Sequence, residues 1–167
     1  MYSATVNNLI NSGEMTMTAL KKETCKDKVE DSFQNLLDDW LLASLFCGET
    51  EENISEYGHD KGAGDYLEYE SLYDYVASTA SFDFVEGNSF SIKLNKSEAV
   101  HSKAGYYRLQ LSWGGPSTEF RIYTDKDLNI DRIEYWYLDW YDGASIIVTD
   151  DIVIDLIQQF LEIESYE

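Results

Sequence analysis

The chain has 167 residues, of which 44% are apolar and 14% aromatic. This length and composition predict one folded domain over residues 1–167 and exclude an intrinsically disordered chain. Twelve Lys and Arg residues stand against 32 Asp and Glu residues, which gives a net charge of −20. Such a charge repels phosphates, which argues against direct binding to nucleic acid. Two uses of the charge remain, solubility alone or recognition of a basic partner.

The expected cellular location follows from the absence of membrane-spanning and secretory signals in the sequence. No stretch is long and apolar enough to span a membrane, and the N-terminus lacks the regions of a secretory signal. Cys25 and Cys47 have no CxxC spacing, which indicates reduced structural thiols rather than a zinc site. We therefore expect a cytoplasmic protein that makes no membrane contact. We expect residues 1–20 to form a poorly ordered leader, or the first fourteen residues to precede an internal start.

The charge lies in blocks along the chain. Residues 1–30 hold four acids and four bases, residues 31–89 fourteen acids and one base, residues 90–124 two acids and five bases, and residues 125–167 twelve acids and two bases. The net charges of these blocks are 0, −13, +3 and −10. Two acidic blocks thus enclose a mildly basic middle, which predicts a polarised surface.

The first predicted element is an amphipathic helix over residues 27–47, because apolar residues recur there at intervals of three and four. Gly48 is a natural end for it. The residues expected to face inward are Val29, Phe33, Leu36, Leu37, Trp40, Leu41 and Ser44.

A loop and a shorter helix are predicted next. Residues 49–65 combine many acids with four glycine or alanine positions, which indicates a mobile loop. The helix is expected over residues 66–78, with Glu68, Glu70 and Asp74 on its outward face. Its expected inward residues are Leu67, Leu72, Tyr73 and Val76.

From Phe82 the apolar residues recur at every second position, which is typical of strands. Strands are predicted over residues 90–94, 107–113 and 119–123, with Gly114 to Ser117 as the turn of a hairpin between the last two. The hairpin residues predicted to face the core are Tyr107, Leu109, Leu111, Trp113, Phe120 and Ile122.

The stretch RIEYWYLDWYDG, from Arg132 to Gly143, is predicted as the central strand of the sheet, over residues 132–141. Six of its twelve residues are Tyr, Trp or Leu. Alternation places large side chains on both faces, so neither face is expected to be simply solvated. One face carries Ile133, Tyr135, Tyr137 and Asp139, and the other carries Glu134, Trp136, Leu138 and Trp140.

The chain ends in a predicted strand over residues 143–148 and a helix capped by Asp150 or Asp151. The order is then N-terminal helices, an antiparallel meander of four or five strands, and a C-terminal helix. This order predicts an α+β fold. The residues of the last helix expected to pack inward are Ile154, Ile157, Phe160 and Leu161.

No arrangement of residues predicts catalysis. His59 and His101 have no sequence-local partner for acid–base chemistry. The glycines of residues 62–64 lack the Lys and Ser/Thr of a phosphate loop. The pairs Asp38-Asp39 and Asp150-Asp151 would point apart on a helix and are interpreted as solvated faces. We expect no enzyme and no cofactor, with carboxylate catalysis as the lesser alternative.

The turn after residue 124 partly matches a calcium-binding loop. Asp125, Asp127 and Asn129 match the first three ligand spacings of such a loop. The sixth position is not glycine, and Glu134 stands at position ten rather than twelve. The sequence therefore predicts no metal site.

Fixed carboxylates mimic the regular charges of a nucleic-acid backbone, so an acidic protein can occupy a basic groove made for DNA or RNA. In size, charge, aromatic content and lack of an active site, the chain resembles the DNA-mimic inhibitors of phages and mobile elements, which act against restriction or CRISPR systems. The stretches YYRLQLSWGGPSTEFRIY and RIEYWYLDWYDG are similar to a pattern in uncharacterised phage and plasmid proteins. The resemblance implies an inhibitor that binds a basic nucleic-acid-binding protein or nuclease complex.

An immunity protein that neutralises a nuclease toxin is the alternative, because such proteins are also small, acidic and cytoplasmic and cover a basic active site with acids and aromatics. In either case the interface is predicted where carboxylates meet large aromatics. The predicted centre is Glu134, Trp136, Asp139, Trp140 and Asp142, with Glu68, Glu70 and Asp74 steering from nearby. The competing interpretation places Trp136 and Trp140 in the core under a helix.

Overall fold

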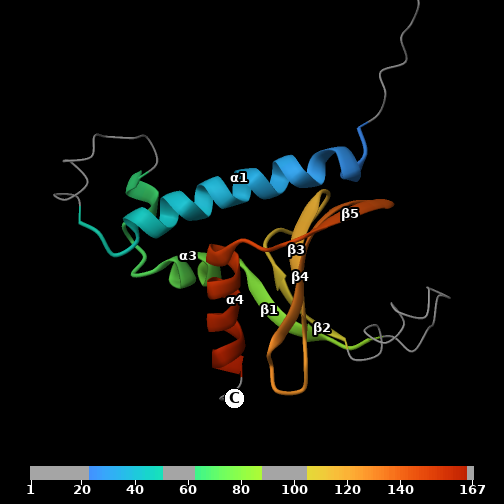
Figure 1. Cartoon of the computed structure of the whole chain (residues 1–167). Coiled ribbons are helices and arrows are strands. Elements are labelled where there is room, and N and C mark those ends of the chain that lie inside the picture. The colour runs from blue at the N-terminus through green and yellow to red at the C-terminus, as the bar shows by residue number, and fades with distance from the viewer. Residues whose placement is uncertain (1–22, 51–62, 88–104, 165–167) are drawn as a thin grey trace, which may run out of the picture.

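The computed structural model describes residues 23–50, 63–87 and 105–164. In Figure 1, a long helix crosses one end of an antiparallel sheet and the shorter helices pack on one side of it. The predicted α+β fold, with N-terminal and C-terminal helices, is confirmed. In chain order the elements are α1 (Cys25–Phe46), η1 (Ala63–Tyr66), α3 (Leu72–Thr79), β1 (Ser81–Val85), β2 (Tyr106–Gln110), β3 (Ser117–Thr124), β4 (Ile130–Asp139), β5 (Asp142–Ile147) and α4 (Asp151–Glu164).

The sheet is a five-stranded meander in the order β1-β2-β3-β4-β5, and every neighbouring pair is antiparallel. The predicted hairpin is confirmed, since Leu109 pairs with Phe120 across β2 and β3. β4 lies inside the sheet, between β3 and β5. It ends at Asp139, two residues before the predicted end, because Trp140 turns the chain with a φ of 52°.

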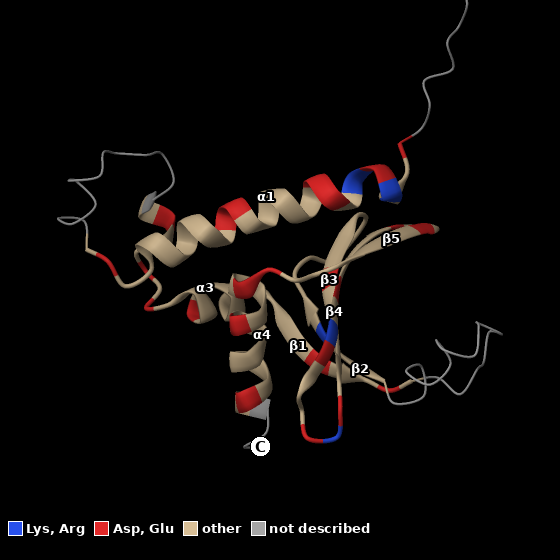
Figure 2. Ribbon diagram, in the orientation of Figure 1, with Lys and Arg blue, Asp and Glu red and all other residues tan. Residues whose placement is uncertain are grey.

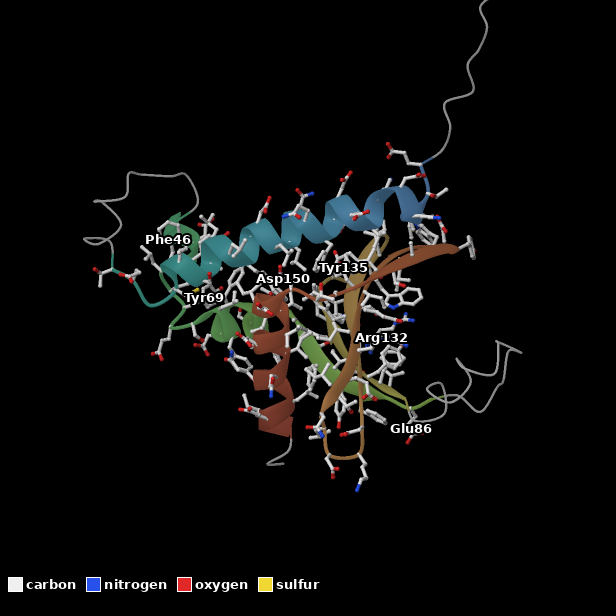
Figure 3. The ribbon with its side chains drawn as sticks, viewed as in Figure 1. Phe46, Tyr69, Glu86, Arg132, Tyr135 and Asp150 are labelled. Carbon is white, nitrogen blue, oxygen red and sulfur yellow. The ribbon has the colours of Figure 1, made fainter. Side chains whose placement is uncertain are left out.

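The inner face of the sheet forms the core together with the helices. Tyr135 is only 1% exposed, and its hydroxyl shares a hydrogen bond with Ser32 of α1 at 2.8 Å. Figure 3 shows Tyr135 directed toward α1 and Arg132 on the side of β4 away from the helices. The predicted inward positions of β3 and α4 are confirmed as buried or packed against the core. The sheet contributes Leu109, Phe120, Ile122, Ile133 and Tyr135, and α4 contributes Val153, Leu156, Ile157, Phe160 and Leu161.

α1 begins and ends close to its predicted limits. A capping box links Thr24 and Asp27 at its start, and Gly48 follows its end with a φ of 80°. The prediction that Leu41 and Ser44 face inward is wrong, because Leu41 is 50% exposed and Ser44 is also exposed. Ala43 is fully buried instead, because the buried stripe continues three residues after Trp40.

The second predicted helix is shorter than expected. α3 starts at Leu72, where the Ser71 side chain accepts a hydrogen bond from the Asp74 N–H and so caps the helix. The segment before α3 is not part of this helix; it is hydrogen-bonded to the residue after α1 instead, since Gly48 N donates to Tyr69 O at 2.8 Å. Val76 is buried and Leu72 and Tyr73 pack against the core as predicted.

Parts of the predicted loop and strands fall differently in the structure. η1 lies at the end of the loop predicted over residues 49–65, and residues 51–62 lie outside the described residues. The strand predicted over residues 90–94, both histidines and the possible leader also lie outside them.

The prediction that Trp113 faces the core is wrong, because its side chain is 61% exposed. β2 ends at Gln110, and the chain then bends through Gly114 and Gly115 toward β3. The period-two alternation therefore stops before Trp113, although Leu111 still packs against the core.

Candidate functional site

The β4–β5 hairpin displays two large aromatic side chains in its turn. Asp139 pairs with Asp142, so the loop between them is Trp140 and Tyr141 alone. Their side chains are 85% and 103% exposed. Two-residue hairpin loops favour Gly, Asn or Asp, and a positive φ costs a residue with a Cβ roughly 1–2 kcal/mol. Stability therefore does not explain Trp140, and the interpretation of it as a core residue is wrong.

Trp140 lies against the neighbouring β2–β3 turn. A Cβ at Gly115 would come within 2.8 Å of the Trp140 indole nitrogen, so this close approach requires glycine. Trp113 stands two residues before Gly115 in the same turn. We call Trp113, Trp140 and Tyr141 the aromatic tip. Single exposed apolar residues are ordinary, but several at adjacent turns form a patch of the kind that binds partners.

The two aspartates beside the aromatic tip lie at the start of α1. Asp142 accepts a hydrogen bond from Cys25 N at 2.7 Å, which places a carboxylate at the positive end of the helix. Burial, followed by the hydrogen bond and charge of Asp142, raises the pKa of the Cys25 thiol. Lys26 is exposed in the same first turn of the helix, so the charge near the tip is mixed. The charge of Asp142 thus has a structural use that the sequence did not indicate.

Glu134 and Trp136 belong to another part of the surface. They lie on the face of β4 opposite Tyr135, and Trp136 Nε1 donates to Glu134 Oε2 at 3.0 Å. Trp136 precedes Trp140 by four residues, about 13 Å along an extended strand. It is half-buried and is not among the described residues that form or pack against the core, so it neither joins the aromatic tip nor packs in the core.

The acids predicted to steer from nearby lie at the opposite end of α1. Glu68, Glu70 and Asp74 are exposed as predicted. Cys47, which follows the last residue of α1, has its pKa raised by burial and then by the charge of Asp74. Because α1 has 22 residues, its two ends are about 33 Å apart at 1.5 Å per residue. We call these three acids, with exposed Glu49 and Asp65, the acidic end.

A carboxylate with two tyrosines attaches the acidic end to α1. Asp39 accepts hydrogen bonds from the hydroxyls of Tyr66 at 2.5 Å and Tyr75 at 3.0 Å. Burial and the bond to Asp39 raise the pKa of Tyr66 to about 12 and also raise that of Tyr75. The interpretation of Asp38-Asp39 as a solvated face is therefore wrong for Asp39. Sequence spacing gives no sign of this contact, because Asp39 and Tyr75 are 36 positions apart.

Other acids at candidate chemical sites also have structural partners. Asp150 accepts a hydrogen bond from Ile152 N and so caps α4, which confirms the predicted cap and corrects the interpretation of Asp150 as part of a solvated face. Asp125 accepts hydrogen bonds from Asp127 N, Asn129 N and the Asn129 side chain, and these bonds lower the pKa of Asp125. Among the residues described, no three metal-ligating side chains form a group. Within the same residues, the structure contains no helix whose length and apolar character would let it cross a membrane.

Figure 2 shows where these charges lie. Acidic residues occur along α1, α3 and α4, while Lys and Arg occur at the start of α1, within the sheet and in the β3–β4 turn. Glu68 and Glu70 form no ion pair with any described lysine or arginine. The arrangement separates an exposed aromatic surface from an exposed acidic one.

Comparison with known proteins found no match to a family model, to a curated protein or to a solved structure. Trp113 and Tyr141 were missing from the predicted interface. The sequence gives no turn signal for Trp140 and Tyr141, because two-residue hairpin loops favour Gly, Asn or Asp; only the pairing of Asp139 with Asp142 shows that they form the loop.

Proposed function

We propose that the chain is an acidic inhibitor that acts in the cytoplasm by occupying the nucleic-acid-binding surface of a basic protein or nuclease complex. Such a surface attracts the chain's net charge of −20 and competes for it with phosphates. The inhibitor is expected to resemble the anti-restriction and anti-CRISPR class in this respect. It needs no catalytic group, because blocking the surface suffices.

One observation supports this proposal above all: a strongly acidic chain keeps an exposed Trp at a positive φ, where a smaller residue would be more stable. Exposed ion pairs contribute only about 0–1 kcal/mol each, so charge alone gives weak affinity. Buried aromatics at interface centres contribute 2 kcal/mol or more. The aromatic tip supplies the apolar anchor that such a complex requires.

The acidic charge is expected to speed the first encounter with a basic partner. Glu30, Asp31 and Asp38 are exposed along α1, and the last two are seven residues apart, about 10 Å on a helix. With the acidic end, these carboxylates extend a negative surface along the molecule toward the tip. A basic groove that binds a phosphate backbone would therefore face a row of carboxylates along its length.

The aromatic tip also suits a second function, that of an immunity protein. A protruding Trp-Tyr loop beside Asp139 is of a form that can enter the active-site cleft of a nuclease toxin. Both functions require a basic partner. Neighbouring genes distinguish them, since a toxin gene directly upstream supports immunity and phage or defence genes support the inhibitor.

The experiment begins with the tagged full chain as bait in cells that carry defence systems, and identifies the partner. The association rate with the purified partner is then measured from low to high salt. Electrostatic steering raises such rates by about 10- to 1,000-fold, so we expect a steep fall as salt increases. A rate that hardly changes would assign the charge to solubility alone and contradict the proposal.

A further inference from the structure

The outer face of the sheet, opposite the core, carries all three arginines of the chain. Each has a carboxylate partner: Arg108 lies 2.8 Å from Asp83, Arg121 2.6 Å from Glu119, and Arg132 3.0 Å from Glu134. The charges on these six side chains cancel. A neutral face on a chain with a net charge of −20 differs from the rest of the surface.

Aromatic rings order this face. The Arg121 guanidinium stacks over Trp136 at 4.0 Å and lies 5.1 Å from the centre of the Tyr106 ring. The Arg132 guanidinium stacks over Tyr123 at 4.2 Å. Trp, Tyr and Arg are the residues enriched at the centres of protein interfaces, and here they are held in place before any partner arrives.

The charges decide which partner fits. The arginines are already neutralised by carboxylates, so the face offers no free cation to a phosphate. It has no net negative charge to attract a basic protein. Two copies of this chain repel each other where their acidic surfaces meet. The outer face is neutral, so two copies that meet through it do not add electrostatic repulsion at the contact.

The size of the face is also adequate. Five strands at about 4.8 Å spacing and β4 at about 3.4 Å per residue give a plane of roughly 20 by 30 Å. The resulting area of about 600 Å² approaches the roughly 800 Å² that each partner contributes to a standard interface, before side-chain relief is added. We propose that the outer faces of two copies pack together and form a homodimer.

The test is the mass of the full chain in solution, measured by sedimentation equilibrium. A mass that rises with concentration from 19.2 toward 38.4 kDa (2 × 19.2) is expected. The dimer is expected to strengthen with salt, because salt screens the repulsion between two acidic copies. Binding to a basic partner weakens with salt, so the dimer and the proposed inhibitor function can fail separately.

Substitutions locate the interface. Ile147 is 58% exposed and lies on the outer face, so Ile147→Lys adds one positive charge to the neutral face of each copy without disturbing the core. We expect it to raise the dimer dissociation constant at least about tenfold. Ser145→Lys, also exposed on this face, is a second variant that should act in the same way.

Ile163→Lys is the matched control, because Ile163 is 48% exposed but lies on α4. It should leave the dissociation constant unchanged. A wild-type chain that stays monomeric at about 200 µM in about 0.5 M salt would overturn the proposal. So would a dimer that Ile147→Lys and Ser145→Lys do not weaken, or that Ile163→Lys weakens equally.

Discussion

The two ends of α1 carry different chemistry. At its start, the aromatic tip presents exposed rings in a strained turn, next to an aspartate that caps the helix. At its end, the acidic end presents exposed carboxylates on a segment held by Asp39. In the proposed inhibitor, the exposed rings would slow dissociation and the exposed carboxylates would speed association. Anchoring and steering are then expected to be separable by substitution.

The largest expected effect comes from the scaffold between the two ends. Tyr135→Ala removes a buried ring and should lower the free energy of unfolding by roughly 3–5 kcal/mol. Both ends would then lose their positions together. Chemical denaturation measures the loss, and a change below about 1 kcal/mol would show that the ring is not part of the core.

The aromatic tip gives the next effect. Trp140→Gly should weaken partner binding by about 2 kcal/mol, or roughly thirtyfold, mainly through faster dissociation. The same change should not lower stability, because glycine adopts the positive φ without strain. Binding kinetics and a denaturation curve are measured together. Lost stability with unchanged binding would assign Trp140 a structural role instead.

The acidic end gives a smaller effect of a different kind. Glu68→Gln/Glu70→Gln should slow association about tenfold at low salt and leave dissociation unchanged. The slowing should disappear at high salt. The variant Glu51→Gln/Glu52→Gln tests instead whether the loop predicted over residues 49–65 contributes to binding. If that pair alone weakens binding, the interface lies in the loop and both ends are wrongly assigned.

Alkaline pH should weaken the attachment of the acidic end to α1. The pKa of Tyr66 is about 12 in the folded chain and 10.0 as its ordinary value. A raised pKa favours the folded state below pH 10, and that contribution is lost as the pH rises from about 10 to about 12. Tyr66→Phe should therefore reduce the loss of stability in this range. An unchanged pH profile would show that the Tyr66 hydroxyl does not titrate as the structure indicates.

Alternation and helical periodicity predicted the order of elements and most of the core, because burial repeats locally along each element. Phe120, Ile122 and Tyr135 were placed correctly for this reason. Trp113 was not, since the same alternation continues in the sequence after the strand has ended. The alternation of apolar residues in the sequence does not show where the hydrogen bonding between strands ends.

The candidate site was only partly predictable. Carboxylates and aromatics do stand together in the sequence at the end of β4, but the prediction also joined Glu68 and Asp74 to them. Their separation follows from the length of α1 and from contacts distant in sequence. The cap from Asp142 to Cys25 spans 117 positions, and no local pattern reports such a pair.

Competition with nucleic acid tests the central claim most directly. Labelled duplex DNA or RNA bound to the identified partner is titrated with the wild-type chain and with Trp140→Gly, and the anisotropy of the label is followed. We expect complete displacement, at a chain concentration that rises with the nucleic acid present, and roughly thirtyfold weaker displacement by Trp140→Gly. Nucleic acid that stays bound while the chain also binds would contradict the account.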